Sequence, residues 1–147
     1  MPLLTLPHRI KPLFLLLLLV AGSPAADTYL GSERCAECHE AEYQAWQGSH
    51  HDLAMQAPTP ETVLGDFNDA RFRYNGVETR FFRRGERFVV RTDGPDGELT
   101  DYDVAYVFGV YPLQQYLLPL ADGRLQALSV AWDARPAAEG GQRWYHL

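Results

Sequence analysis

Both cysteines of this 147-residue chain belong to one short run, CAECH, which spans Cys35 to His39. Two cysteines separated by two residues and followed at once by a histidine are typical of covalent haem c attachment. Such thiols add to the vinyl groups on one edge of the porphyrin, and the histidine lies beneath the iron as its proximal ligand. The run therefore predicts that Cys35 and Cys38 attach haem c and that His39 ligates the iron.

Other uses of a CxxC pair fit this sequence less well. A thioredoxin-like site follows a buried strand, and the stretch DTYLGSER before Cys35 predicts no such strand. A zinc site would need two more histidines, and His50 and His51 are adjacent rather than three to five residues apart. A disulfide alone would leave the histidine after Cys38 unexplained. Haem attachment accounts for all three residues of the motif.

The amino terminus predicts export. His8, Arg9 and Lys11 precede the apolar run PLFLLLLLV, and the small-residue stretch AGSPAA follows it, which is the order found in a secretory signal peptide. The apolar run is too short to cross a hydrocarbon layer of about 30 Å as a helix. We expect cleavage after Ala25, so that residues 1–25 are the signal peptide. The expected location is the periplasm, with membrane contact only during export.

A second group of candidate ligands follows the CxxCH run. The stretch EAEYQAWQ, residues 40–47, favours a helix that Gly48 would end, and Ser49 is placed to cap a further turn. One straight helix would separate His39 from His51 by about 18 Å, whereas two axial nitrogens on one iron lie about 4 Å apart. Either the chain reverses at Gly48, or the histidine serves a second haem whose cysteines lie in another chain.

Two further residues are alternative sixth ligands, namely His50 and Met55. A Met/His pair would raise the reduction potential relative to bis-histidine ligation, although a methionine at this spacing more often fills a core. Tyr43 and Trp46 are three residues apart, so they share a helix face that can lie against an apolar ring. We expect this pair to shield the haem.

The stretch CAECHEAEYQAWQGSHHDLAM resembles the amino-terminal haem module of bacterial multihaem cytochromes c in the cytochrome c-552/c-554-like family, some members of which carry carboxyl-terminal tetratricopeptide repeats. In that family a CxxCH run is followed by W-x-x-S-x-H, whose histidine is an axial ligand. Trp46, Ser49 and His51 fill this pattern, so the resemblance implies that His51, rather than His50, is the distal ligand of this or a neighbouring haem. Family members carry several CxxCH runs, whereas this sequence has one.

The rest of the chain predicts strands. Pro58 and Pro60 disfavour a helix, so residues 57–68 are expected to be a linker. Beyond them, aromatic and β-branched residues alternate with the turn signals NG, RG, DGPDG and DG. The expected strands are Arg71–Tyr74, Val77–Arg83, Arg87–Thr92, Thr100–Phe108, Arg124–Trp132 and Arg143–His146. The apolar segment YPLQQYLLPL, residues 111–120, is either ordinary core or a turn that packs over the haem module.

These features predict an α+β fold. A short haem-binding helical module should occupy residues 26–56 and be joined by the linker to a small antiparallel β meander or sandwich at residues 69–147. The sequence stops inside an expected strand, so we expect the β region to be cut short at its carboxyl end and the chain to be part of a larger cytochrome.

Charge narrows the choice of partners. The net charge of −6 argues against nucleic acid, because binding to nucleic acid depends on basic residues that neutralise phosphates. Arginines nevertheless cluster in one window that holds only Glu78 and Glu86 as acidic residues: Arg71, Arg73, Arg80, Arg83, Arg84, Arg87 and Arg91. This window is either the solvated face of a hairpin or a docking surface for an acidic redox partner or for the propionates of a cofactor.

The sequence as a whole predicts an exported c-type cytochrome module that transfers electrons to redox partner proteins or further haem modules. No nucleophile elbow or phosphate-binding loop is present, so an enzyme would have to depend on haem, and an electron carrier is the favoured reading. Two alternatives stay open. The resemblance to multihaem proteins allows a haem-dependent oxidoreductase acting on small nitrogen compounds, and the β region allows a haem-anchored module that binds a partner.

Overall fold

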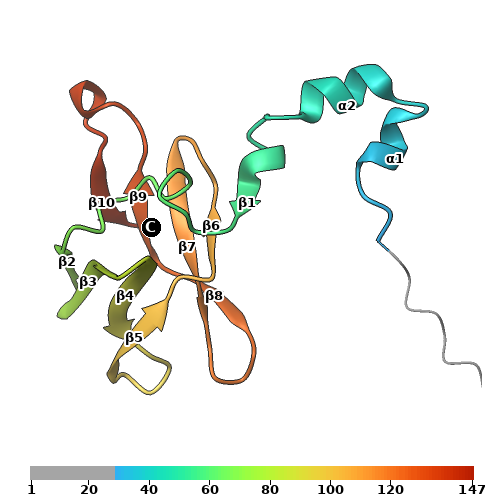
Figure 1. Cartoon of the computed structure of the whole chain (residues 1–147). Coiled ribbons are helices and arrows are strands. Elements are labelled where there is room, and N and C mark those ends of the chain that lie inside the picture. Colours follow the sequence, from blue (N-terminus) through green and yellow to red (C-terminus); the bar gives the residue numbers. More distant parts are fainter. Residues whose placement is uncertain (1–28) are drawn as a thin grey trace, which may run out of the picture.

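A computed structural model describes residues 29–147 of the chain. The predicted signal peptide at residues 1–25 lies outside the described residues. Figure 1 shows the short helices at one end of the molecule, joined through a thin stretch of chain to a β-rich body. Within residues 29–147, no helix combines the length and the apolar character needed to cross a membrane.

The helical part consists of α1 (Glu33–Ala36), α2 (Glu40–Trp46) and the 3-10 turn η1 (Asp52–Ala54). Helix α2 coincides with the helix predicted from EAEYQAWQ, and it ends before Gly48, whose φ of 69° lies in the left-handed region that glycine adopts without strain. Neither α1 nor α2 contains a buried residue. The helices are therefore not part of the core of the β-rich body.

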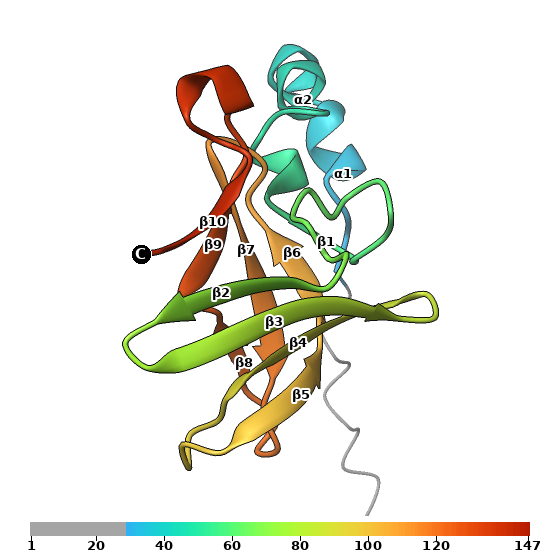
Figure 2. The ribbon, with the colours of Figure 1, turned by 90° about the vertical axis from the view of Figure 1, so that its left-hand side faces the viewer.

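Ten strands form two antiparallel sheets. The larger sheet has the order β1-β6-β7-β9-β10, with β8 also paired to β7, and the smaller sheet has the order β2-β3-β4-β5. Figure 2 shows that the strands of the smaller sheet cross those of the larger one at a steep angle, as in orthogonal sandwiches. Together with the two helices this is a small α+β arrangement, as predicted. The strands are β1 (Met55–Gln56), β2 (Ala70–Tyr74), β3 (Val77–Arg84), β4 (Arg87–Asp93), β5 (Leu99–Asp103), β6 (Tyr106–Phe108), β7 (Leu113–Pro119), β8 (Leu125–Ala127), β9 (Val130–Asp133) and β10 (Arg143–His146).

The first three predicted strands and the last one match β2, β3, β4 and β10 to within a residue at each end. Two longer predictions were wrong, because each covers two strands. The predicted strand at residues 100–108 passes from one sheet to the other: Val104 N–H donates to Phe88 O at 2.9 Å in the smaller sheet, and Ala105 N–H donates to Leu117 O at 2.9 Å in the larger sheet. The predicted strand at residues 124–132 is likewise divided into β8 and β9.

Residues 113–119 form strand β7, so the alternative prediction of a turn at residues 111–120 was wrong. It pairs with β6, β8 and β9 in the larger sheet, and Gln114, Tyr116 and Leu118 are buried along one of its faces. Its two prolines did not prevent a strand because Pro112 precedes it and Pro119 is its last residue, where a missing N–H costs the ladder little. The alternative interpretation of this segment as ordinary core is the correct one.

The segment at residues 57–68, expected to be a linker, is packed into the β region. Phe67 is only 3% exposed and lies at the centre of the core. Its ring makes edge-to-face contacts with four aromatic rings from both sheets, at centroid distances of 5.1–5.8 Å: Phe81, Phe88, Tyr116 and Trp144. Phe67 therefore anchors the segment that leads from the helices to β2, and Val63 of the same stretch also packs against the core.

The fully buried side chain of Gln114 fixes the same segment by hydrogen bonds. Its Nε2 donates to Thr62 O at 2.9 Å and to Gly109 O at 3.1 Å, and its Oε1 accepts from Leu64 N–H at 2.9 Å and from the Tyr116 hydroxyl at 2.8 Å. Both donors and both acceptor positions of the amide are thus used, which is what a buried polar group needs in order to be stable.

Candidate functional site

The CxxCH run is wound around a single carbonyl group. Cys35 lies in α1, and its carbonyl oxygen accepts hydrogen bonds from Cys38 N–H at 3.3 Å and from His39 N–H at 2.9 Å. His39 precedes the first residue of α2, and its own carbonyl accepts from Tyr43 N–H at 2.9 Å. The short spacing of the motif therefore produces a compact turn between the two helices, which holds the two cysteines and the histidine close together in the fold.

Both thiols are free and exposed to solvent. The His39 imidazole is exposed as well. An attachment site for a large cofactor requires this accessibility, because the porphyrin must approach both sulfurs from outside. The alternative of a disulfide between Cys35 and Cys38 is not formed in this structure.

A shallow pocket of about 310 Å³ lies beside this turn. The α2 side chains of Tyr43 and Trp46 form one wall, with their ring centroids 6.3 Å apart and their planes inclined by 27°. Cys35 and His39 line the same pocket, so a thiol, an imidazole and an aromatic wall face one space. The remaining lining residues are Ser32 and Glu42.

Sequence reasoning singled out four of these six residues and missed Ser32 and Glu42. Their positions follow the helical spacing of the others, since Ser32 is three residues before Cys35 and Glu42 is three residues after His39. Both residues could have been found by looking three or four residues before and after the motif, because residues at that spacing share one face of a helix. Cys38 does not line this pocket, although it shares the turn.

The second histidine pair lies beyond the break at Gly48. Gly48 N–H donates to Asp52 Oδ2 at 2.8 Å, and Asp52 N–H donates to Ser49 Oγ at 3.3 Å, so the Ser49 side chain holds the turn that leads into η1. His50 is exposed, and its ring lies 6.2 Å from that of Tyr111 in the β region. His51 is exposed too and immediately precedes η1. Neither histidine lines the pocket that Cys35 and His39 share.

Met55 is placed differently from the other candidate ligands. It belongs to β1, opposite Phe108 of β6, and is 55% exposed. It is thus neither core filler nor a lining residue of the pocket beside the motif. Across the described part of the chain, no three side chains of the types His, Cys, Asp or Glu gather in the way that would hold a bare metal ion. The four residues considered for zinc are therefore not brought together.

Comparison with known proteins bears on the same segment. The model of the family described as cytochrome c554 and c-prime matches residues 34–67, which include the CxxCH run, α2 and the histidine pair. No curated protein and no solved structure matches the chain. The match covers the motif and its helical surroundings, and it stops at Phe67, before the strands of the smaller sheet. Residues 34–67 are accordingly a c-type cytochrome-like region, as the resemblance predicted.

Proposed function

We propose that this chain is an exported c-type cytochrome module that binds haem c covalently and transfers electrons. The observation that carries the proposal is the CxxCH run inside a cytochrome-like segment, with both thiols free and His39 beside Cys35 on one pocket. A mixed set of two thiols and one imidazole is the donor set of haem c attachment. Export rests on the predicted signal peptide and would deliver the chain to the periplasm.

The residues of the turn fit the cofactor. Cys35 and Cys38 would each form a thioether with one vinyl group, and His39 would ligate the iron from the proximal side. Bound haem supplies an iron that alternates between two oxidation states. Tyr43 and Trp46 would lie against the ring and reduce its exposure, which is one of the means by which a protein tunes a reduction potential.

His51 is the proposed distal ligand, with His50 and Met55 as alternates. The helix break at Gly48 removes the difficulty that one straight helix would carry the histidine about 18 Å away along its axis. The pocket beside the motif includes none of the three side chains, so the distal ligand would have to approach this haem by a movement of the segment at residues 48–55. Otherwise it would serve the haem of a neighbouring module, as multihaem relatives imply.

The attachment of haem is tested by expressing the whole chain together with a cytochrome c maturation system and analysing periplasmic material. Intact mass should show the mature chain plus one haem, and the pyridine haemochrome spectrum should indicate thioether linkage to both vinyl groups. In Cys35→Ser/Cys38→Ser the added mass should be absent. The matched control is Ser32→Ala, which changes a residue that lines the pocket but neither attaches the haem nor ligates its iron. This variant should keep the haem. A colourless wild-type protein with its two sulfurs joined to each other would contradict the proposal.

A catalytic role is the second candidate, and one observation favours it. The lining of the pocket contains His39 but no second histidine and no methionine. An iron with an open sixth position binds small ligands, which is the basis of haem oxidoreductases that act on small nitrogen compounds. Carbon monoxide or cyanide binding at a rate typical of a five-coordinate haem would support this role, whereas a six-coordinate low-spin iron without such binding would support the electron carrier.

A further inference from the structure

The outer face of the smaller sheet carries six of the seven arginines that stood out in the sequence. Register places their side chains on one side of β2, β3 and β4, while Arg83 alternates to the other side and lies over the ring of Phe88 at 4.7 Å. The six side chains are 38–73% exposed. We name this surface the arginine face: Arg71, Arg73, Arg80, Arg84, Arg87 and Arg91.

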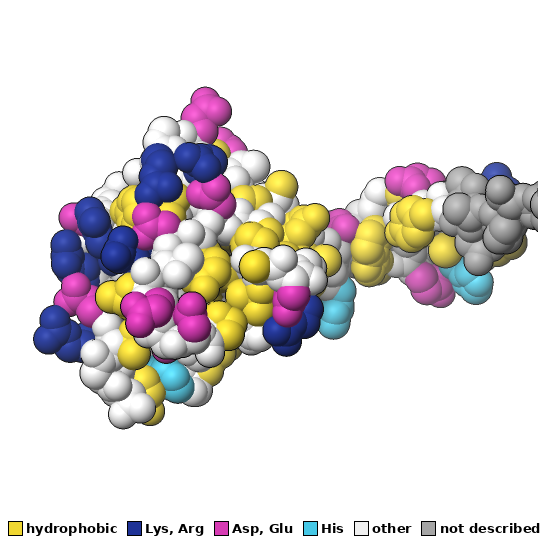
Figure 3. Space-filling model, turned by 90° about the horizontal axis from the view of Figure 1, so that it is seen from below, with side chains coloured by type: hydrophobic (Ala, Val, Ile, Leu, Met, Phe, Trp, Pro, Cys, Tyr) yellow, Lys and Arg dark blue, Asp and Glu magenta, His cyan; other side chains and the backbone are white. Residues whose placement is uncertain are grey.

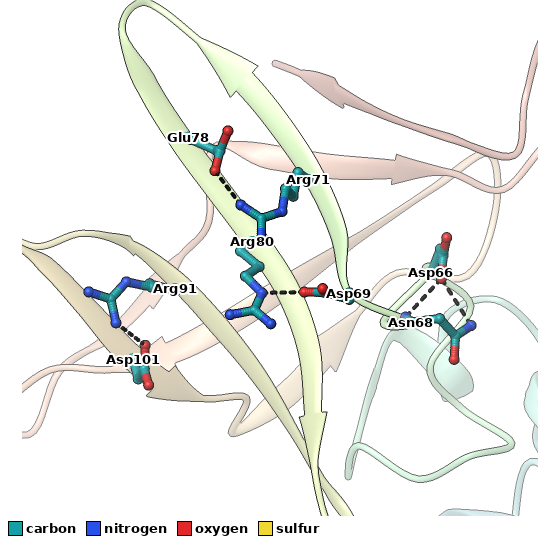
Figure 4. Close-up of polar contacts among 8 residues, drawn as sticks. All are labelled: Asp66, Asn68, Asp69, Arg71, Glu78, Arg80, Arg91 and Asp101. Carbon is teal, nitrogen blue, oxygen red and sulfur yellow. Dashed lines mark hydrogen bonds and ion pairs between the residues drawn. The ribbon is translucent and has the colours of Figure 1, made fainter.

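Three of these arginines stand directly opposite one another on adjacent strands. Arg71 of β2 pairs with Arg80 of β3, and Arg80 pairs with Arg91 of β4, so that a row of like charges crosses the sheet (Figure 4). Like charges directly opposite in a sheet reduce its stability. The row of arginines therefore lowers the stability of the sheet, which points to a role of these side chains in binding another molecule.

Carboxylates reduce this repulsion but do not cancel it. Glu78 pairs with Arg71 at 2.8 Å and with Arg73 at 2.7 Å, and Asp101 pairs with both Arg84 and Arg91. Asp69 pairs with Arg80, and Asp103 pairs with Arg87 at 2.6 Å. Arg73 and Arg71 lower the pKa of Glu78, and Arg80 lowers that of Asp69, so both carboxyl groups are ionised at neutral pH. These ion pairs join six guanidinium groups to four carboxylates, so the paired side chains themselves carry an excess of two positive charges.

The guanidinium groups also keep free donors. Each carries five N–H donors, and two of the four carboxylates are shared between two arginines, so most donors point to solvent. The aliphatic stems are held in place, because Arg80 and Arg84 lie over the ring of Phe82 at 4.8 Å and 5.6 Å and Val89 beneath the face is fully buried. The face is thus an ordered array of planar guanidinium groups, each of which can bind a carboxylate through two parallel hydrogen bonds.

We propose that the arginine face docks an acidic protein surface. A membrane fits less well, since the aromatic side chain of the face, Phe82, is covered by arginines. The exposed large apolar side chain on the same side of the sheet, Leu99, stands alone at the start of the edge strand β5. The propionates of a haem bound at the CxxCH turn fit less well too, because β2, β3 and β4 lie away from α1 and α2 (Figure 1). Figure 3 shows that most basic side chains on this face of the molecule, interspersed with acidic ones, lie toward the end of the β region that is opposite the helices.

The test uses the whole haem-loaded protein and soluble poly-L-glutamate as an acidic polypeptide probe. Affinity measured by calorimetry should fall steeply between about 0.05 and 0.2 M NaCl, because exposed charges are screened over that range. Arg80→Gln/Arg91→Gln should weaken binding about ten-fold. The pair with the most exposed side chains, Arg73→Gln/Arg87→Gln, should act in the same direction and provides a test that does not touch the central row.

The matched control, Arg124→Gln/Arg143→Gln, removes the same charge from β10 and the turn after β7, and it should leave the affinity within about two-fold. Circular dichroism melting shows whether each variant is folded, and haem stoichiometry shows that attachment is intact, so this proposal can fail independently of the proposed function. Equal weakening by the control pair, or no wild-type binding at the lower salt, overturns the proposal. Tighter binding to phosphatidylglycerol vesicles than to poly-L-glutamate also overturns it, in favour of a lipid surface.

Discussion

His50 and His51 are adjacent residues in different surroundings. The ring of His50 lies 6.2 Å from that of Tyr111, so moving it to a haem would require giving up a contact with the β region. His51 is exposed at the start of η1 and can move with that turn alone. At the scale of single residues, this difference is a reason to propose His51 rather than His50 as the distal ligand, the same choice that the W-x-x-S-x-H pattern implies.

Replacing His51 by alanine in the haem-loaded protein should convert a low-spin, six-coordinate iron into a high-spin one, because the distal imidazole is lost. The measurement is the electronic absorption and electron paramagnetic resonance spectrum of the oxidised protein. His50→Ala is the matched control and should leave the spectrum unchanged. Identical wild-type and His51→Ala spectra would remove His51 as a ligand of this haem, and a change confined to His50→Ala would transfer the role to His50.

At the scale of secondary structure, Gln114 connects β7 to a segment that lies 50 to 52 residues earlier in the sequence. It joins β7 to residues 62–64 and to Gly109, and its acceptor oxygen also orients the Tyr116 hydroxyl, which accepts from Gly65 N–H at 2.9 Å. Burial raises the pKa of Tyr116, so this hydroxyl remains protonated and can donate. This amide therefore helps to fix the path of the chain from the helices to the β region, together with the packing of Phe67.

Gln114→Leu should therefore lower the free energy of unfolding by about 2–4 kcal/mol, because Leu64 N–H and the carbonyls of Thr62 and Gly109 lose their partners inside the protein. Urea unfolding followed by the fluorescence of the buried Trp132 and Trp144 measures the change. Gln126→Leu makes the same substitution at an exposed position and should have an effect below about 0.5 kcal/mol. Similar losses in the two variants would show that the amide network is not what stabilises the segment.

The same elements show what the sequence could and could not predict. Aromatic and β-branched residues located β2, β3 and β4, because each of these strands is a short run that ends at a glycine turn. Strand β7 was not predicted, because proline lowers the expectation of a strand and no local signal shows that Pro112 and Pro119 lie at its ends. The packing of residues 57–68 was not predicted either, because it depends on contacts between Phe67 and aromatic rings that are 14 to 77 residues away in the sequence.

The candidate site was easier to predict because its geometry is local. Cys35, Cys38 and His39 are gathered by one turn, and Tyr43 and Trp46 follow at helical spacing, so residues 35–46 contain the whole arrangement. The position of the distal histidine is different, since it depends on the direction that the chain takes after Gly48 and on the contact of His50 with Tyr111. Contacts of that kind cannot be read from spacing alone.

At the scale of the whole molecule, the cytochrome-like turn and the β region have separate structural roles. The core consists of residues from Val63 onward, and α1 and α2 bury none of their side chains. The connection runs through η1 and β1, where Gly109 N–H donates to Ala54 O at 2.7 Å and Met55 lies opposite Phe108. The helices are therefore held to the body mainly by one short edge strand, as Figure 1 shows.

This separation predicts that the β region unfolds at the same temperature with and without the cofactor. Cys35→Ser/Cys38→Ser should keep the midpoint within about 2 °C of the haem-loaded protein in scanning calorimetry, because a coupling of only 1 kcal/mol would shift a domain of this size by about 4–8 °C. Phe67→Ala serves as the positive control, since the loss of the central ring should remove about 3–5 kcal/mol. A midpoint that falls in the serine variant by as much as in Phe67→Ala would mean that the cofactor is part of the core, and the two regions would then have to be regarded as one cooperative unit.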